Sequence, residues 1–492
     1  MRKRFEQQLD FRITPISEVQ IPTKSRDELP PVLRALQHIF VTPELNEPIF
    51  KLLEEKICKG KKKTGRKGMD LWHIFVLAVV RQTLDTNWDR LHWIANGDTF
   101  IRGIMGVLPV KDEDEFKYQT ILDNVSLLDD ELLLSINNIV VQAGHSLIKK
   151  KGEEGLRLKS DSYVLETNVH FPTDLNLLWD GCRKCLDTVD KLRGVMQVSG
   201  WRKIKQIRRK LKSQFRETSH EVFCGKKEEN KKQSVKNYMK PAQLLHTRCE
   251  AVLNGPVNIF AVEDQRYVLI LLLELERYTK YVETFMDQIK RRLLKGEIIP
   301  AAEKIFSIFE EHTEWISKGK LNKRVELGHL LLITTDQYKY IVDYKIMEGE
   351  KDASQIGPLL KRLENKFVDT KIKSHSFDKG FYSSANLQLL QNSKVEEVIL
   401  PKRGRHNKED KEREGSKSFK KLRNQHSAVE SNINMLEHHG LNRCVDKGMH
   451  GFKRCVGLSV LAYNLHIMGN QLKAIDKAKE GNKQPASVRK VA

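Results

Sequence analysis

The sequence contains little cysteine and no long hydrophobic run. Seven cysteines occur in 492 residues, a low and odd number that excludes a disulfide-stabilised secreted scaffold and is typical of a reducing cytosol. The first residues are basic but lack the apolar segment of a signal peptide. The longest apolar runs, 71–80 and 267–273, are too short to span a bilayer. We therefore expect a soluble, cytoplasmic protein.

Acidic residues are scarce relative to basic ones. Lys and Arg number 86 and Asp and Glu number 65, which gives a formal net charge of +21. A surplus of this size favours a polyanionic partner, either nucleic acid or an anionic membrane surface. Hydrophobic residues make up 39% of the chain, which is enough for a folded protein, and the length predicts about three domains.

The spacing of apolar residues divides the chain into helical and strand-bearing parts. Residues 1–150 are predicted to be mostly helical, because apolar residues recur there at helical intervals. Alternation in 156–161 predicts a strand that ends at Asp161. Residues 174–323 show helical patterns almost exclusively, including one at 301–316. We therefore predict a long helical insertion after the first strand.

Strand patterns return after this insertion. The predicted strands are 329–335, 340–347, 371–377 and 395–400; the predicted helices are 352–367, 384–391, 425–438 and 448–472; and 401–423 is predicted to be a polar loop. These patterns predict an α/β core built from 151–173 and 324–472. The lysine-rich end, 473–492, is predicted to be disordered.

Three acidic residues occupy the places where such a core would carry a metal site. Asp161 ends the first strand, Asp378 follows a later strand, and Glu430 lies on the helix after the last strand. Mg²⁺ prefers hard oxygen ligands, and one or two carboxylates with substrate phosphates and water complete its shell. Two such ions activate an attacking oxygen and stabilise a leaving one. The set therefore predicts a metal-binding site.

The segments around these acids form three ordered blocks. The first is Asp-Ser-Tyr-Val-Leu-Glu-Thr-Asn-Val-His-Phe-Pro-Thr-Asp at 161–174, followed by 177–183; the second is Ser-Phe-Asp-Lys-Gly-Phe-Tyr-Ser at 376–383; and the third is 425–443. They resemble the catalytic blocks of DDE transposases from bacterial insertion sequences, of the ISNCY-type group. The segments 448–454 and 461–465 also fit, and the resemblance extends from the N-terminal helical region to about residue 472.

This resemblance implies a fold, a reaction and a set of partners. It implies an RNase H-like mixed-sheet core in which Asp161, Asp378 and Glu430 are the catalytic metal ligands for two Mg²⁺ ions, with Mn²⁺ as a substitute. The implied reaction is hydrolysis at the ends of a mobile element, followed by attack of the freed 3′-hydroxyl on target DNA. Double-stranded DNA, a homodimer that brings two ends together and an association with the nucleoid follow from that activity.

The chain departs from the family pattern near the third acid. Many relatives place a Tyr and an Arg before this carboxylate and a Lys seven residues after it, where this chain has Arg423, His426 and Glu437. Arg423 and His426 are predicted to contact phosphate. Glu437 cannot act as the lysine does, so that role would pass to Arg443 or Lys447.

Some of these assignments have rivals in the sequence. Glu437 and Asp446 compete with Glu430 as the third acid, and Asp174 and Asp180 are either structural or direct contacts of DNA or metal. Two pairs have zinc-like spacing, Cys182 with Cys185 and His246 with Cys249. We favour ordinary helical cysteines for these pairs.

Basic segments are predicted to hold DNA through its phosphates, which provides affinity without sequence readout. The candidates lie in 59–67, 202–212 and 402–421 and beside the third acid: Lys61, Lys62, Lys63, Arg66, Arg208, Arg209, Lys402, Arg403, Arg405, Arg423, His426 and Arg443. The N-terminal helices are predicted to recognise DNA ends or to dimerise. Two alternatives to a transposase stay open, namely a Mg²⁺-dependent DNA nuclease and a catalytically silent DNA-binding protein.

Overall fold

The computed structural model describes residues 2–6, 11–22, 24–60, 67–108, 115–148, 155–255, 264–317, 324–368 and 370–483, with the backbone alone for 480–483. The chain folds as two compact units. One, here called the sheet unit, contains residues 1–168 and 316–492; the other, the helical unit, contains 169–315. The predicted insertion, 174–323, overlaps the helical unit, whereas the N-terminal region, 1–150, belongs to the sheet unit.

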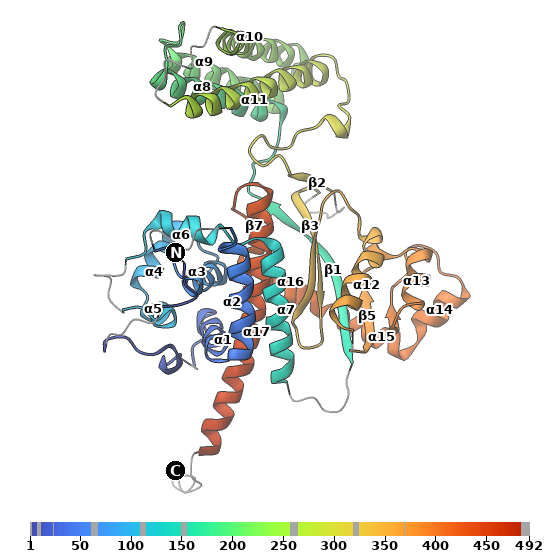
Figure 1. Ribbon diagram of the computed structural model, residues 1–492. Helices are drawn as coiled ribbons and strands as arrows, with labels where there is room; N and C mark the ends of the chain where they lie inside the picture. Colours follow the sequence, from blue (N-terminus) through green and yellow to red (C-terminus); the bar gives the residue numbers. More distant parts are fainter. Residues whose placement is uncertain are drawn as a thin grey trace, which may run out of the picture. The chain divides into compact units, whose positions relative to one another are not determined.

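The sheet unit is built on a mixed β-sheet in which β2 (Glu314–Ile316), β3, β1, β5 and β6 are neighbours in this order, and β4 also pairs with β3. Figure 1 labels β1, β2, β3 and β5 of this sheet. Its strands are β1 (Leu156–Thr167), β3 (Glu326–Thr335), β4 (Ile341–Met347), β5 (Ile372–Phe377), β6 (Val395–Ile399) and the short β7 (Arg443–Cys444). β3 runs antiparallel to β1 and β4, whereas β5 runs parallel to β1 and β6. β7 pairs in parallel with the end of β1. The prediction of a mixed α/β architecture is confirmed.

β1 is longer than the sequence pattern indicated. Its ladder with β5 ends at the pair Ser160–Phe377, but its ladder with β3 continues to Glu166. The prediction that this strand ends at Asp161 is therefore wrong. The alternation fades after Asp161 because β1 is paired with β3 alone until β7 joins it at Glu166, and the side chains of 161–164 are half-buried on both faces.

Helices from the N-terminal region pack around one helix that is buried on all sides. α3 (Leu71–Thr83) has every residue buried, as expected for a helix without a polar face. The surrounding helices are α1 (Leu29–Val41), α2 (Pro43–Ile57), α4 (Trp88–Gly97), α5 (Thr99–Met105), α6 (Tyr118–Val125) and α7 (Asp130–Leu147), preceded by a 3₁₀ turn at Ile16–Glu18.

The C-terminal helix links these helices to the sheet. α17 (Gly448–Lys483) packs against α1, α3, α7 and β4 (Figure 1), and 36 residues make it about 54 Å long. Gly469 permits the close approach of α1, because a Cβ there would lie 1.8 Å from the Pro31 carbonyl oxygen. Residues 473–483 continue this helix instead of the predicted disorder; 484–492 lie outside the described residues.

Further helices follow the later strands. They are α12 (Ile356–Lys366), α13 (Ser384–Gln391), α14 (Lys408–Gly415), α15 (Lys417–His426) and α16 (Ala428–Leu436), with 3₁₀ turns at Asp352–Ser354 and Lys379–Phe381 and a π turn at Glu437–Leu441. The predicted loop at 401–423 is wrong, because it contains α14 and most of α15. Side-chain caps start both helices: Asn407 and Asp410 form a capping box, and Ser416 accepts from the Phe419 amide.

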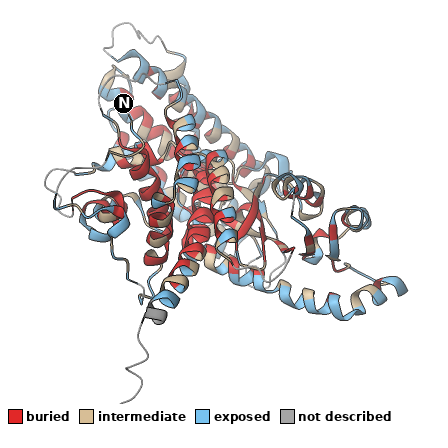
Figure 2. Ribbon diagram, turned by 60° about the horizontal axis from the view of Figure 1, so that its bottom comes forward, coloured by how far each residue is buried: buried red, intermediate tan, exposed pale blue. Residues whose placement is uncertain are grey.

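Both faces of the sheet are covered (Figure 2). Leu156, Leu158 and Leu332 face the core shared with the N-terminal helices. The opposite face carries Leu165, Leu331 and Ile333, which pack with residues of α16 and α17 such as Val429, Leu436 and Val456. Each such side chain, when fully buried, contributes roughly 1.5–3 kcal/mol of transfer free energy. α16 is therefore fixed on the face that carries the odd-numbered side chains of β1.

The helical unit has its own hydrophobic core. It contains α8 (Asp174–Val195), α9 (Ile204–Cys224), α10 (Glu228–Leu253) and α11 (Gln265–Ile289), with a π turn at Lys290–Leu294. The predicted helix at 301–316 is wrong: a 3₁₀ turn at Ala301–Glu303 and a strand, β2 (Glu314–Ile316), are present instead. Ser307 accepts bonds from the Phe309 and Glu310 amides, and this local pairing competes with helix formation.

No helix within these described ranges is both long and apolar enough to cross a bilayer.

Candidate active site

Strand register brings two of the predicted acids to neighbouring positions. In the parallel ladder of β1 and β5, Lys159 is opposite Ser376 and Ser160 is opposite Phe377. The next residues on the two strands are Asp161 and Asp378. Neighbouring strands are about 4.8 Å apart, so these carboxylates leave the backbone side by side where the ladder ends.

The same register shows which face Asp161 occupies. Asp161 is paired with Ile333 of β3, and Ile333 belongs to the core beneath α16 and α17. Paired residues project to the same side of a sheet, so Asp161 also points to the face that α16 covers. Asp161 is half-buried, and its Oδ1 accepts a hydrogen bond of 2.7 Å from the Ser162 amide.

A histidine attaches α15 to this part of the sheet. The Ser376 hydroxyl and His426 Nδ1 lie 2.9 Å apart, and Ser376 is two residues before Asp378. Burial lowers the pKa of His426 to about 4, against the opposing effect of the Asp378 carboxylate and with a further lowering from Lys159. His426 is therefore neutral at pH 7, and both of those charges lie close to its ring.

The position of Glu430 follows from this attachment of α15. Ser427, between α15 and α16, keeps helical dihedral angles of −55° and −20°, so Glu430 lies one helical turn after His426. Val429 and Leu436 are buried against the sheet, whereas Glu430 is exposed. Glu430 therefore projects from the edge of α16 rather than into the core beneath that helix.

The three carboxylates do not form a closed metal cage in this structure. Across the described residues, no group of three or more His, Cys, Asp or Glu side chains is arranged to hold a metal ion. Asp378 and Glu430 are exposed, and the donors are all hard oxygens, which is the ligand type that Mg²⁺ prefers. Mg²⁺ commonly takes only one or two protein carboxylates and completes its shell with phosphate and water, so the donor set fits an ion shared with a substrate.

The two rivals of Glu430 have different surroundings. Glu437 is exposed at the start of the π turn after α16, and its charge adds to the effect of burial in raising the pKa of Tyr163 in β1. Asp446 is buried, with Oδ1 2.6 Å from Arg81 Nη2 and Oδ2 3.3 Å from Arg454 Nη2. Both oxygens of Asp446 are occupied by arginines, which makes it a structural residue.

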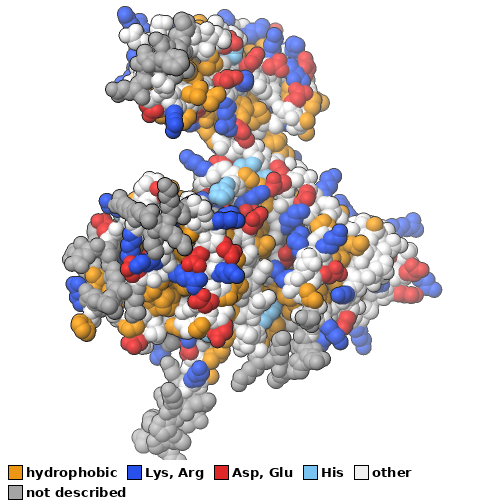
Figure 3. Space-filling model, in the orientation of Figure 1, with side chains coloured by type: hydrophobic (Ala, Val, Ile, Leu, Met, Phe, Trp, Pro, Cys, Tyr) orange, Lys and Arg blue, Asp and Glu red, His pale blue; other side chains and the backbone are white. Residues whose placement is uncertain are grey.

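The predicted DNA-binding cations divide into paired and exposed groups. Arg208 binds Asp187, Lys402 binds Asp410, and Arg443 binds Glu166. Arg209, Arg403, Arg405 and Arg423 are exposed. Figure 3 shows Lys and Arg side chains spread over the surface among acidic ones. Lys61, Lys62, Lys63 and Arg66 lie outside the described residues.

Two residues near the acids were missed by the sequence reasoning. Lys159 lies on the same face as Asp161, opposite Ser376, and burial lowers its pKa. The alternation of 156–161 contained this signal, because Lys159 and Asp161 are two residues apart. On the other face, His375 Nε2 lies 2.7 Å from the Ser160 hydroxyl, which also contacts Thr334. Nothing in the sequence pattern indicated this buried network.

The remaining candidates lie in the helical unit. Asp174 pairs with Arg292, and Asp180 is buried between His170 and Arg183, where burial raises its pKa. The zinc-like pairs place Cys182, Cys185 and Cys249 in the hydrophobic core of this unit, and among the described residues they form no metal-binding group. All these residues have structural surroundings.

His375 predicts a specific loss of stability in acid. Burial lowers its pKa to about 3 from an ordinary value of 6.5, so the unfolded chain takes up the proton first as the pH falls. This histidine therefore destabilises the fold progressively from pH 6.5 down to about 3, by about 1.4 kcal/mol per pH unit. We expect the free energy of unfolding, measured in urea between pH 7 and pH 5, to depend less steeply on pH in His375→Gln than in wild type. The difference in slope should correspond to about one fewer proton taken up on unfolding. An equal dependence in both proteins would contradict this.

Comparison of the chain with protein-family models, with curated proteins and with solved structures finds no match in any of the three. The residues and geometry of the chain itself are therefore the basis for assigning a function.

Proposed function

We propose that this protein is a DDE-type DNA transposase, which cuts the ends of a mobile element and joins their 3′-hydroxyls to target DNA. The observation that carries the proposal is the β1–β5 register, which makes Asp161 and Asp378 neighbours, together with the attachment of the Glu430 helix through His426. Residues far apart in the sequence thus meet at the end of one ladder, as a phosphoryl-transfer site requires.

The proposal includes an RNase H-like core. Its support is the order β4-β3-β1-β5-β6, in which three antiparallel neighbours are followed by two parallel strands. The covered faces and the acid at the end of β5 are in keeping with such a core. The helical unit follows the first core strand, in the place where the spacing of apolar residues predicts a long helical insertion.

In this proposal, Asp161, Asp378 and Glu430 hold two Mg²⁺ ions, which would activate the attacking oxygen and stabilise the leaving oxygen. The other residues position DNA around them. Lys159 and Arg423 carry charge to the phosphate backbone, and neutral His426 keeps α15 and α16 in place through Ser376. Arg443 bonds Glu166 at the end of β1 and is the candidate for the role that lysine has in relatives.

Double-stranded DNA is the proposed partner, and joining two element ends implies at least a homodimer. The net charge of +21 supports a polyanionic partner. In this proposal the N-terminal helices contact either the DNA ends or a second subunit.

The direct test is an assay with labelled DNA that carries the gene's own flanking ends. We expect wild-type protein to release the ends and form joined product in Mg²⁺ or Mn²⁺, with neither product in EDTA. Cleavage without joining would overturn the transposase in favour of a nuclease. Binding without either product, across a range of metal and salt conditions, would favour a silent DNA-binding protein.

A further inference from the structure

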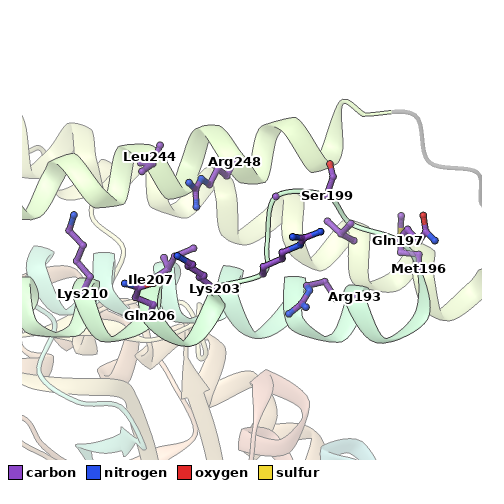
Figure 4. Close-up of a pocket in the computed structure, with 13 residues that line it drawn as sticks. Arg193, Met196, Gln197, Ser199, Lys203, Gln206, Ile207, Lys210, Leu244 and Arg248 are labelled. Carbon is purple, nitrogen blue, oxygen red and sulfur yellow. The ribbon is translucent and has the colours of Figure 1, made fainter.

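The helical unit contains a large hollow, with a volume of about 1080 Å³, that the sequence did not reveal. Its walls come from the C-terminal end of α8, the loop between α8 and α9, the start of α9 and the side of α10 (Figure 4). Arg248 extends from α10 toward the segment that carries Arg193 and Lys203 (Figure 4). Gly200 has φ +83° in this loop, a conformation that favours glycine.

The charged side chains that line this hollow are all cationic. Its lining contains five cationic side chains and no carboxylate: Arg193, Arg202, Lys203, Lys210 and Arg248. Arg193 contacts Asp190 at 3.4 Å. Among the described residues, no ion pair or side-chain hydrogen bond involves the other four. Cations that line one space repel one another, and Asp190 offsets only the charge of Arg193, so an anion bound among them would relieve that repulsion.

The rest of the lining indicates what kind of anion fits. Ser199, Gln197 and Gln206 offer hydrogen-bonding groups, while Val198, Ile207 and other apolar side chains line the same space. The volume is far larger than one phosphate ion requires and matches the upper range of small-ligand pockets. A chain of phosphates joined by sugars carries repeated negative charges, which complement the cations of these walls. Its sugars also offer apolar surface to the apolar side chains.

Basic residues lie on both faces of α9, but only one of these faces lines the hollow. Lys203, Gln206, Ile207 and Lys210 line the hollow, whereas Lys205 and Arg209 are exposed and do not line it. At 100° per residue, Lys205 and Arg209 lie on the side of α9 away from the hollow. Arg208 and Arg209, the two candidates from the sequence, therefore do not line this hollow.

We propose that this hollow is a phosphate clamp through which the helical unit binds consecutive backbone phosphates of duplex DNA. The inference rests on the proposed function for its choice of DNA, but it assigns binding to residues outside the carboxylate site. The clamp contributes affinity and salt dependence rather than sequence readout.

The test compares two variants that lose the same charge from exposed or half-buried positions. Lys203→Ala/Arg248→Ala removes two cations of the hollow, and Lys205→Ala/Arg209→Ala removes two from the exposed side of α9. Full-length protein would be titrated with a labelled duplex of about 30 base pairs in EDTA, at roughly 50 to 200 mM salt. Circular dichroism melting would check that both variants fold as wild type does.

We expect the hollow variant to bind at least about tenfold more weakly at low salt, with a log–log salt slope smaller by about 1.8, since each phosphate contact contributes about 0.9. The control variant should bind within about twofold of wild type. Equal losses in both variants would overturn the clamp in favour of diffuse attraction. Tight binding of inorganic pyrophosphate, with unchanged DNA binding by the hollow variant, would overturn it in favour of a small-anion site.

Because EDTA removes catalysis from this experiment, the two proposals can fail separately. Normal binding by the hollow variant, with wild-type cleavage and joining, would overturn the clamp and leave the transposase. Clamp-dependent binding by a wild-type protein that never cleaves DNA would support the clamp and contradict the transposase.

Discussion

Replacing Asp378 with asparagine is expected to lower metal-dependent DNA cleavage by about a thousandfold or more, roughly 4 kcal/mol of transition-state stabilisation. Asp378 is exposed at the end of β5, beside Asp161 on the neighbouring strand. Asparagine keeps the shape but removes the charge that would attract the metal ions. Since no buried interaction is lost, DNA binding in EDTA and thermal stability should stay close to wild type.

The matched variants make this result specific. Asp161→Asn and Glu430→Gln should reduce cleavage to a similar extent, whereas Glu437→Gln, on the same helical segment and also exposed, should leave it within a few-fold of wild type. Single-turnover cleavage of a pre-bound labelled end would separate chemistry from binding. Full activity in Asp378→Asn would contradict the assigned site. Activity that is lost in Glu437→Gln but kept in Glu430→Gln would reassign the third acid.

Replacing Asp446 with asparagine is expected to lower the free energy of unfolding of the sheet unit by about 3–5 kcal/mol. Asp446 accepts bonds from Arg81 and Arg454, and all three side chains are buried. Removal of the carboxylate charge leaves two guanidinium groups inside the protein without a compensating anion. Arg81 also lies over the Trp88 ring at 4.0 Å, so its displacement would disturb the contact of α3 with α4.

Urea unfolding followed by circular dichroism would measure this loss, with Glu437→Gln as the exposed acidic control. The double variant Arg81→Met/Asp446→Leu, which removes one charge of each sign, should recover part of the stability. The opposite pattern, in which Asp446→Asn unfolds as wild type does but cleaves no DNA, would contradict the structural role and restore Asp446 as a candidate ligand.

The sequence predicted elements better than it predicted their pairing. Alternation in 156–161 and the strand patterns of 329–335 and 371–377 indicated strands, and these strands are present. The register that places Asp161 beside Asp378 could not be predicted, because it depends on contacts between segments separated by the whole helical unit. Helices α14 and α15 were missed because their sequences are highly polar and are started by caps rather than by an apolar stripe.

The surroundings of individual residues were the least predictable part of the candidate site. Asp446 was a rival of the preferred Glu430 in the sequence, and the buried guanidinium groups of Arg81 and Arg454 that bind it could not be predicted. The hollow of the helical unit is lined by parts of three helices and a loop. A basic run in the sequence shows how much charge is present, but not which face of a helix it occupies.

Anomalous diffraction from crystals of the wild-type protein, bound to a DNA end and soaked in Mn²⁺, would test most directly whether Asp161, Asp378 and Glu430 hold the catalytic ions. We expect anomalous peaks within coordination distance, about 2.0–2.3 Å, of the oxygens of Asp161 and Asp378, with Glu430 completing the site next to a DNA phosphate. Mn²⁺ bound to DNA but away from these carboxylates, or bound to a different set of acids, would contradict this assignment.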